Sequence, residues 1–204
     1  MARLSALVLL AALLVAVAAN RSSFRGKCPI NLGKTPFDPR KMAGEWFIQA
    51  GTPLFGEQLS RCARFTVRPR LEGHELFYDI QYNALSPRDG QPYALESKSQ
   101  AYNPHRGALS LGVWRRAGTA EYSEPFGQSV VATDYKTFAV FLACRPVYDA
   151  STRTFQRALA AQVWGRSASM DDDARRALAD LLSSYDVARE DIKMADQDNC
   201  SYAY

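Results

Sequence analysis

The chain has 204 residues with 25 Lys and Arg against 21 Asp and Glu, a formal net charge of +4 and enough length for one domain with a substantial core. The basic residues are scattered, with only short doublets such as Arg115-Arg116, so the charge pattern excludes a nucleic-acid-binding stripe. We expect a mildly basic, well-solvated surface.

The first 19 residues have the three parts of a secretory signal peptide. Arg3 supplies the positive charge, residues 7–17 form the apolar core, and residues 16–18 supply the small side chains of a cleavage site. The apolar run is too short for a comfortable membrane anchor. The sequence therefore predicts a cleaved signal peptide over residues 1–19 and a secreted single domain over residues 20–204.

Short apolar-alternating segments separated by turn residues follow the first cysteine. We expect eight strands, over residues 44–52, 61–69, 75–82, 93–102, 109–113, 129–133, 137–144 and 154–165. Serial short strands of this kind predict an all-β sandwich or an up-and-down barrel. An eight-stranded barrel encloses a volume that can hold one small ligand.

One helix is expected after the last strand. Ser169 or Asp171 can cap it, and the run of aspartates suits the positive end of the helix dipole. An apolar stripe at helical spacing consists of Ala174, Ala177, Leu178, Leu181 and Leu182. We expect this stripe to pack on the outside of the sheet and residues 186–204 to be extended.

The four cysteines are Cys28, Cys62, Cys144 and Cys200. None has the C-x-x-C spacing of a zinc or redox motif. An even count in a secreted chain predicts two disulfides, and spacing alone leaves three connectivities open.

The sequence gives little evidence of a catalytic or metal-binding motif. The two histidines, His74 and His105, lie in or near predicted turns without an H-E-x-x-H context, and no G-x-S-x-G occurs. We therefore expect no enzyme, no metal site and no required cofactor.

Three separated fragments resemble the signature regions of the lipocalins. The fragments are Gly44-Glu45-Trp46, Thr133-Asp134-Tyr135 and Arg166. The resemblance covers essentially the whole chain after the leader and implies an all-β, eight-stranded antiparallel up-and-down barrel with one C-terminal helix packed outside. It also implies that Trp46 closes one end beneath the Arg166 guanidinium, and that Thr133 and Asp134 bond the backbone of their turn.

Further fragments look like the branch that contains apolipoprotein D, insecticyanin-type bilin binders and crustacyanin subunits. They are Lys27-Cys28-Pro29, Arg61-Cys62, Ala132-Thr133-Asp134-Tyr135, Cys144 and Asp198-Asn199-Cys200. This resemblance implies the disulfides Cys28–Cys144 and Cys62–Cys200. Every cysteine would then have a partner, which leaves no thiol for the isomerase chemistry of one lipocalin branch.

The resemblance implies a secreted carrier of one small hydrophobic molecule: a lipid, fatty acid, retinoid, steroid, bilin or carotenoid. The side chains expected to line the ligand cavity or fill the core beside it are Ile48, Phe65, Val67, Tyr78, Ile80, Tyr93, Leu95, Leu111, Val113, Phe138, Val140 and Gln162. Tyrosine hydroxyls and Gln162 would orient a polar end of the ligand.

Two alternatives to the carrier stay open. One is a surface-mediated interaction protein or pigment-complex subunit that uses edge aromatics such as Trp114; the other is a lipocalin-type isomerase. The loop at residues 52–60, with Leu54 and Phe55, could form a lid, a lipid-contacting tip or a loop folded on itself, so weak membrane or lipoprotein contact also stays open. The partner we expect is a hydrophobic small molecule, such as a bound pigment or lipid, and not nucleic acid. The chain could be a monomer or a homo- or heterodimer.

Overall fold

The computed structural model describes residues 27–29, 33–53, 59–102 and 108–201. The predicted signal peptide and the Leu54-Phe55 loop tip lie outside these residues. Among the described residues, no helix is both long enough and apolar enough to cross a membrane.

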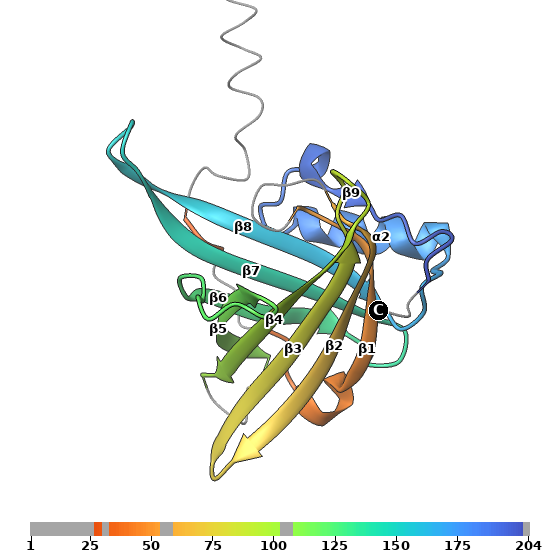
Figure 1. Cartoon of the computed structure of the whole chain (residues 1–204), viewed down its shortest axis with the longest axis horizontal. Coiled ribbons are helices and arrows are strands. Elements are labelled where there is room, and N and C mark those ends of the chain that lie inside the picture. The colour runs from red at the N-terminus through yellow and green to blue at the C-terminus, as the bar shows by residue number, and fades with distance from the viewer. Residues whose placement is uncertain (1–26, 30–32, 54–58, 103–107, 202–204) are drawn as a thin grey trace, which may run out of the picture.

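Eight antiparallel strands form a closed barrel in serial order (Figure 1). The strands are β1 Gly44–Gly51, β2 Arg61–Glu72, β3 Glu75–Leu85, β4 Pro92–Ala101, β5 Leu109–Arg116, β6 Phe126–Thr133, β7 Phe138–Asp149 and β8 Thr154–Gly165. The sheet closes because β1 pairs with β2 on one side and with β8 on the other. The predicted fold class is therefore confirmed, and the sandwich alternative is excluded.

Alternation along the strands divides side chains between the barrel interior and its outer surface. In β3 every second residue from Leu76 to Ala84 is buried, while the residues between them are more exposed. Neighbouring strands keep the same division, since Phe65 of β2 lies opposite Tyr82 of β3. The interior core follows from this period of two.

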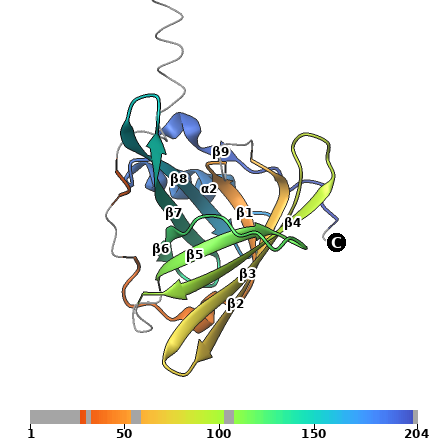
Figure 2. The same cartoon turned by 60° about the vertical axis from the view of Figure 1, so that its left-hand side comes forward.

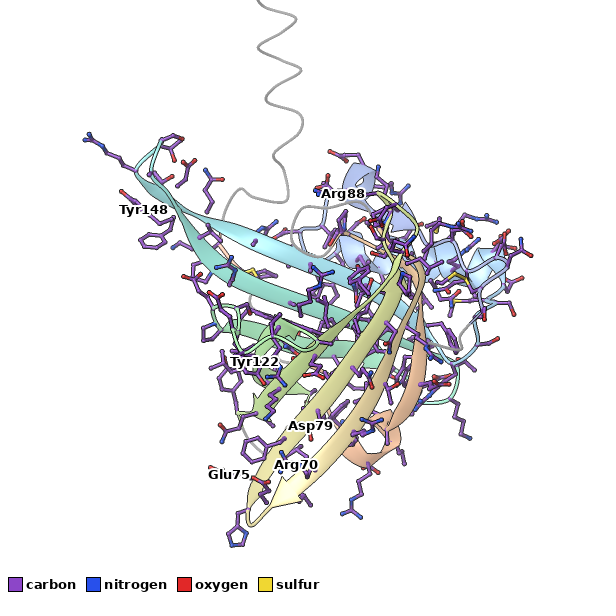
Figure 3. All side chains as sticks on the ribbon, viewed as in Figure 1. Arg70, Glu75, Asp79, Arg88, Tyr122 and Tyr148 are labelled. Carbon is purple, nitrogen blue, oxygen red and sulfur yellow. A yellow bond between two sulfur atoms is a disulfide. The ribbon has the colours of Figure 1, made fainter. Side chains whose placement is uncertain are left out.

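The β7–β8 hairpin is longer than its neighbours and projects from the barrel (Figures 1 and 2). Pairing of β7 with β6 reaches only to Cys144, and pairing of β8 with β1 begins at Gln162. Beyond these residues the two strands pair with each other as far as Asp149 and Thr154. Figure 3 places the exposed Tyr148 on this projecting part.

The helix α2, Asp172–Ser183, packs on the outside of the barrel. Asp171 caps it by accepting hydrogen bonds from the backbone N–H groups of Asp173 and Ala174. Leu182 and Ala179 are its buried residues. The predicted stripe is wrong in its first turns: Ala174 and Ala177 are exposed, because the helix meets the barrel through its C-terminal half.

The described residues also form two short 3-10 helices, η2 Pro39–Met42 and η5 Arg189–Asp191, and a ninth strand, β9 Lys193–Met194. The strand β9 pairs with the outer end of β1, where Met194 lies opposite Ala50. The tail after residue 186 is therefore not simply extended, since it includes η5 and β9 and is held to the barrel by this pairing.

Candidate functional site

One end of the barrel is closed by Trp46, Tyr135 and Arg166, which we call the barrel floor. Trp46 is completely buried, and its indole N–H donates to the Met42 carbonyl at 2.9 Å. The Arg166 guanidinium lies 3.7 Å from the centre of the Trp46 ring, a cation–π contact. It also donates hydrogen bonds of 2.7, 2.9, 3.0 and 3.1 Å to the carbonyls of Lys41, Ala43, Glu45 and Tyr135.

The turn at Thr133-Asp134-Tyr135 braces this floor. The Thr133 hydroxyl accepts from the Tyr135 N–H at 2.8 Å and donates to the Phe138 carbonyl at 2.6 Å. The Asp134 carboxylate accepts from the backbone N–H groups of the next residues, including Phe138 at 3.0 Å. Partial burial by itself would raise the pKa of Asp134, but these hydrogen bonds outweigh it and lower the pKa to about 2.

A column of aromatic rings rises from the floor through the barrel. Ring centres lie 6.3 Å apart for Trp46 and Trp164, 4.4 Å for Trp164 and Phe65, and 5.0 Å for Phe65 and Tyr82. Tyr82 continues the column to Tyr93 at 5.8 Å. These rings fill much of the interior, so the barrel is less hollow than its strand number suggests.

The column ends in a small hydroxyl cluster on the mouth side. The Tyr93 and Ser60 hydroxyls are 2.6 Å apart, and the Tyr93 hydroxyl donates to that of Tyr82 at 3.4 Å. Burial raises the pKa of Tyr82 well above its ordinary value, and burial also raises the pKa of Tyr78. The interior therefore disfavours negative charge.

The inner faces of β4, β5 and β6 differ from the rest of the barrel because they carry small and polar residues. We call this set, Ser97, Ser99, Ser110 and Gln128, the inner polar seam; all four are buried. The Ser99 hydroxyl donates to the Gln128 side-chain oxygen at 3.3 Å and lies 3.4 Å from the Ser97 hydroxyl. The seam places hydrogen-bonding groups opposite the apolar walls of β2 and β3.

A small, partly open void of about 30 Å³ lies between the seam and those walls at the floor end of the barrel, where Phe37 and Met42 also line it. Its lining includes Val67, Tyr78, Ile80, Val130, Ser110 and Gln128. This volume is enough for one or two water molecules, whereas a drug-sized ligand needs about 300 Å³ or more. A ligand of the predicted kind would therefore have to displace side chains of the aromatic column.

A larger groove of about 610 Å³ lies outside the barrel, between η2 and the end of β2. It is lined by Phe37, Asp38, Pro39, Arg40, Pro69, Arg70, Leu71 and Leu76. Figure 3 shows Arg70 beside Asp79 near the β2–β3 turn, and the Arg70 Nε donates to the Asp79 carboxylate at 3.1 Å. None of the residues predicted to bind ligand lines this groove.

Eight of the twelve predicted cavity residues lie on the inner faces of their strands. They are Ile48, Phe65, Val67, Tyr78, Ile80, Tyr93, Leu95 and Gln162. Gln162 is placed inside because it lies opposite the interior residue Phe141, and its side-chain oxygen accepts from the Trp164 indole N–H at 2.9 Å.

Leu111 and Val113 are not cavity residues, and their predicted place is wrong. Val113 lies opposite Lys98, and the more exposed Leu111 lies opposite Gln100, so both face outward with these polar residues. The inner face of β5 instead carries Ser110, Gly112 and Trp114. Alternation in the sequence showed the period of two in this strand, but the apolar residues were assigned to the inner face when they lie on the outer face.

Phe138 and Val140 are also misplaced by the prediction. Both pack in the outer cluster beneath α2, where Val140 is completely buried with Val163 and Leu182. The strand β7 is covered on its inner face by the barrel core and on its outer face by the helix. Both faces of β7 are therefore apolar, and the sequence pattern of this strand does not show which face is inside the barrel.

The sequence reasoning missed several interior residues. Trp164 could have been found, because it lies two residues after Gln162 and shares its face. Trp114 was expected at an edge where it could contact a partner, and this is wrong: its side chain is only 5% exposed and lies 6.1 Å from the Phe65 ring. The interior position of Gln128 could not be predicted, because the strand that contains it was expected to begin one residue later, at Ser129.

The disulfides implied by the resemblance are confirmed, as Cys28–Cys144 and Cys62–Cys200. All four cysteines are thus paired. Among the described residues, no group of three or more His, Cys, Asp or Glu side chains could hold a metal ion.

No protein-family model matches the sequence, and no curated protein matches it either. Solved structures do match. Apocrustacyanin C1 has a TM-score of 0.62 at 18% identity, over 88% of this chain and 93% of that chain. Insecticyanin from the tobacco hornworm Manduca sexta has a TM-score of 0.61 at 18% identity, over 88% and 92%. The cockroach allergen Per a 4 has a TM-score of 0.54 at 17% identity, over 85% and 97%. With its signature residues joined at the barrel floor, the chain therefore has the lipocalin fold.

Proposed function

We propose that this protein is a secreted carrier that holds one small hydrophobic molecule inside its barrel. The observation that carries the proposal is the interior itself: a closed barrel, shut at one end by Trp46 and Arg166, surrounds an apolar core that contains a void. The two disulfides support an oxidising, extracellular location. The ligand classes are those that the lipocalin resemblance implies.

Burial of apolar surface would supply the affinity. A ligand that buries about 400 Å² of apolar surface gains about 10 kcal/mol before the costs of association are subtracted. Because the void is small, part of this gain goes to moving aromatic side chains apart. We therefore expect affinities near micromolar and binding that changes the packing of the column.

Tryptophan fluorescence tests the carrier function directly, since all three tryptophans of the chain, Trp46, Trp114 and Trp164, are buried in the barrel core. Saturable quenching by at least one member of the bilin, carotenoid, fatty acid or retinoid and steroid classes supports a carrier. Native mass spectrometry of protein purified from its source should also show a bound small molecule. Absence of a co-purified ligand together with no quenching by any class would overturn the proposal.

A second candidate, self-association through the projecting hairpin, is favoured by one observation. Tyr148 is 54% exposed and Phe155 is 73% exposed, and their rings lie 5.3 Å apart on the β7–β8 hairpin. Exposed paired aromatics of this kind are typical of contact surfaces. Sedimentation velocity should show a dimer that is lost in the Tyr148→Ser, Phe155→Ser double variant; a monomer at all concentrations would rule this candidate out.

A further inference from the structure

Three buried N–H groups inside the barrel have no acceptor among the described residues. They are the Nε2 amide of Gln128, the Nε2 amide of Gln162 and the indole Nε1 of Trp114. The three side chains are 4%, 0% and 5% exposed, respectively. A buried donor without an acceptor is costly, so groups of this kind call for an explanation.

The orientation of the Gln162 amide is set by the protein. An indole N–H can only donate, so the Trp164 hydrogen bond fixes the Gln162 oxygen toward Trp164 and turns its NH₂ group elsewhere. The Gln128 oxygen accepts from the Ser99 hydroxyl. Both glutamines thus use their side-chain oxygen within the protein, and their Nε2 groups have no acceptor among the described residues.

Gly112 makes the place for the Gln128 amide. A Cβ atom added to Gly112 would lie 1.8 Å from the Gln128 Nε2 and 2.7 Å from the Ser99 hydroxyl. Only glycine leaves this space while Gln128 keeps its present position, and Gln128 in that position lines the void. The Gln128 side chain, with its buried Nε2 packed against Gly112, thus lies beside the void.

Among the residues that the structure describes, no cationic side chain lies in the barrel interior beside these donors. Among the described residues, Arg157 is the charged side chain that is buried, and it lies on the outer face of β8, where it donates to the Lys27 and Asp186 carbonyls. The raised pKa values of Tyr78 and Tyr82 reflect the same poorly solvated interior. A carboxylate that entered the barrel would lose its water without gaining a cation.

We propose that the barrel selects neutral apolar molecules bearing a carbonyl oxygen, as in a ketone, ester or amide, and that this oxygen accepts a hydrogen bond from the Gln128 Nε2. A carboxylate of the same size is excluded because no cation balances it. The proposal rests on the proposed carrier function and names the chemistry of its ligand.

Three naphthalene probes of matched size separate the possibilities. They are 6-propionyl-2-dimethylaminonaphthalene, a ketone; 6-dimethylamino-2-naphthylacetic acid, a carboxylate at pH 7.5; and 2-dimethylamino-6-propylnaphthalene, which has no carbonyl. Affinities are measured by tryptophan quenching on the full disulfide-bonded chain. We expect the ketone to bind about tenfold more tightly than the other two.

Variants locate the contact. Gln128→Leu should lower ketone affinity about tenfold and leave the propyl probe unchanged, whereas Gln100→Leu, at an exposed position on the outer face of β4, should change neither. Gly112→Ala, which displaces the Gln128 amide, should reproduce the loss and serves as the second variant if Gln128→Leu does not fold.

The outcomes distinguish the two proposals. Equal binding of ketone and carboxylate, or a ketone affinity that survives both Gln128→Leu and Gly112→Ala, overturns the carbonyl selectivity and leaves the carrier function standing. Failure of all three probes to bind, together with failure of the wider ligand panel, overturns the carrier function itself.

Discussion

The barrel floor and the inner polar seam lie in the same barrel interior, yet they differ in how fully their polar groups are hydrogen-bonded. At the floor, the indole N–H of Trp46 and the guanidinium of Arg166 are paired with backbone carbonyls. At the seam, the Nε2 of Gln128, which lies beside a void, has no acceptor among the residues that the structure describes. A saturated network stabilises a fold, whereas a spare donor in an apolar interior is suited to a ligand.

The division predicts that floor variants change stability and seam variants change ligand preference. The largest effect is expected for Arg166→Met, which removes the contact with Trp46 and the hydrogen bonds to four carbonyls. We expect the free energy of unfolding to fall by about 3 kcal/mol in urea titrations at pH 7.

The matched control is Arg176→Met, because Arg176 forms an exposed ion pair with Asp173 on α2 and should be close to neutral. An Arg166→Met protein as stable as this control would show that the floor is not the structural anchor.

A smaller, pH-dependent effect is expected for Asp134→Asn. The folded-state pKa of Asp134 is about 2, below the unfolded value of about 3.9. Its stabilising contribution is therefore fully present above about pH 4 and is lost as the pH falls toward 2.

Because Asp134 is largely exposed, solvent screens its interactions, and we expect Asp134→Asn to lower the free energy of unfolding by about 1 kcal/mol at pH 7. Unfolding measured at pH 7 and at pH 2 should show the difference between the two proteins shrinking at the lower pH. A difference that is the same at both values would mean that the carboxylate charge plays no part.

The smallest stability effect is expected for Gln128→Leu. The substitution removes an unpartnered buried donor and also the hydrogen bond from Ser99, so the two changes nearly cancel. We expect a change of less than about 1 kcal/mol in the free energy of unfolding. A loss above about 2 kcal/mol would assign Gln128 to the structure and erase the difference between floor and seam.

The contrast between floor and seam also explains which parts of the barrel could be predicted from the sequence. The floor was predictable from the lipocalin resemblance, which rests on the short motifs that contain Trp46, Asp134 and Arg166. Faces were predictable where one side of a strand is polar, as in β3. They were not predictable for β7, which is apolar on both sides, or for β5, whose apolar set faces outward. In both strands, pairing register and the helix decide the face.

Gln128 shows a second limit. Whether a buried amide is satisfied depends on which side chains meet it across the sheet, and Ser99 and Gly112 come from two other strands. No local pattern in one strand carries that information. The ligand-selecting part of the barrel is therefore visible only in three dimensions.

Infrared difference spectroscopy of the bound ketone probe tests the central claim most directly, because the C=O stretching frequency reports hydrogen bonding at the carbonyl oxygen itself. We predict that the band of 6-propionyl-2-dimethylaminonaphthalene in the native barrel lies at lower frequency than in alkane, and that in Gln128→Leu it returns to the alkane value. A bound ketone whose band matches alkane in the native protein, or is unchanged by the substitution, would contradict the assignment of the inner polar seam as the ligand-selecting part of the barrel.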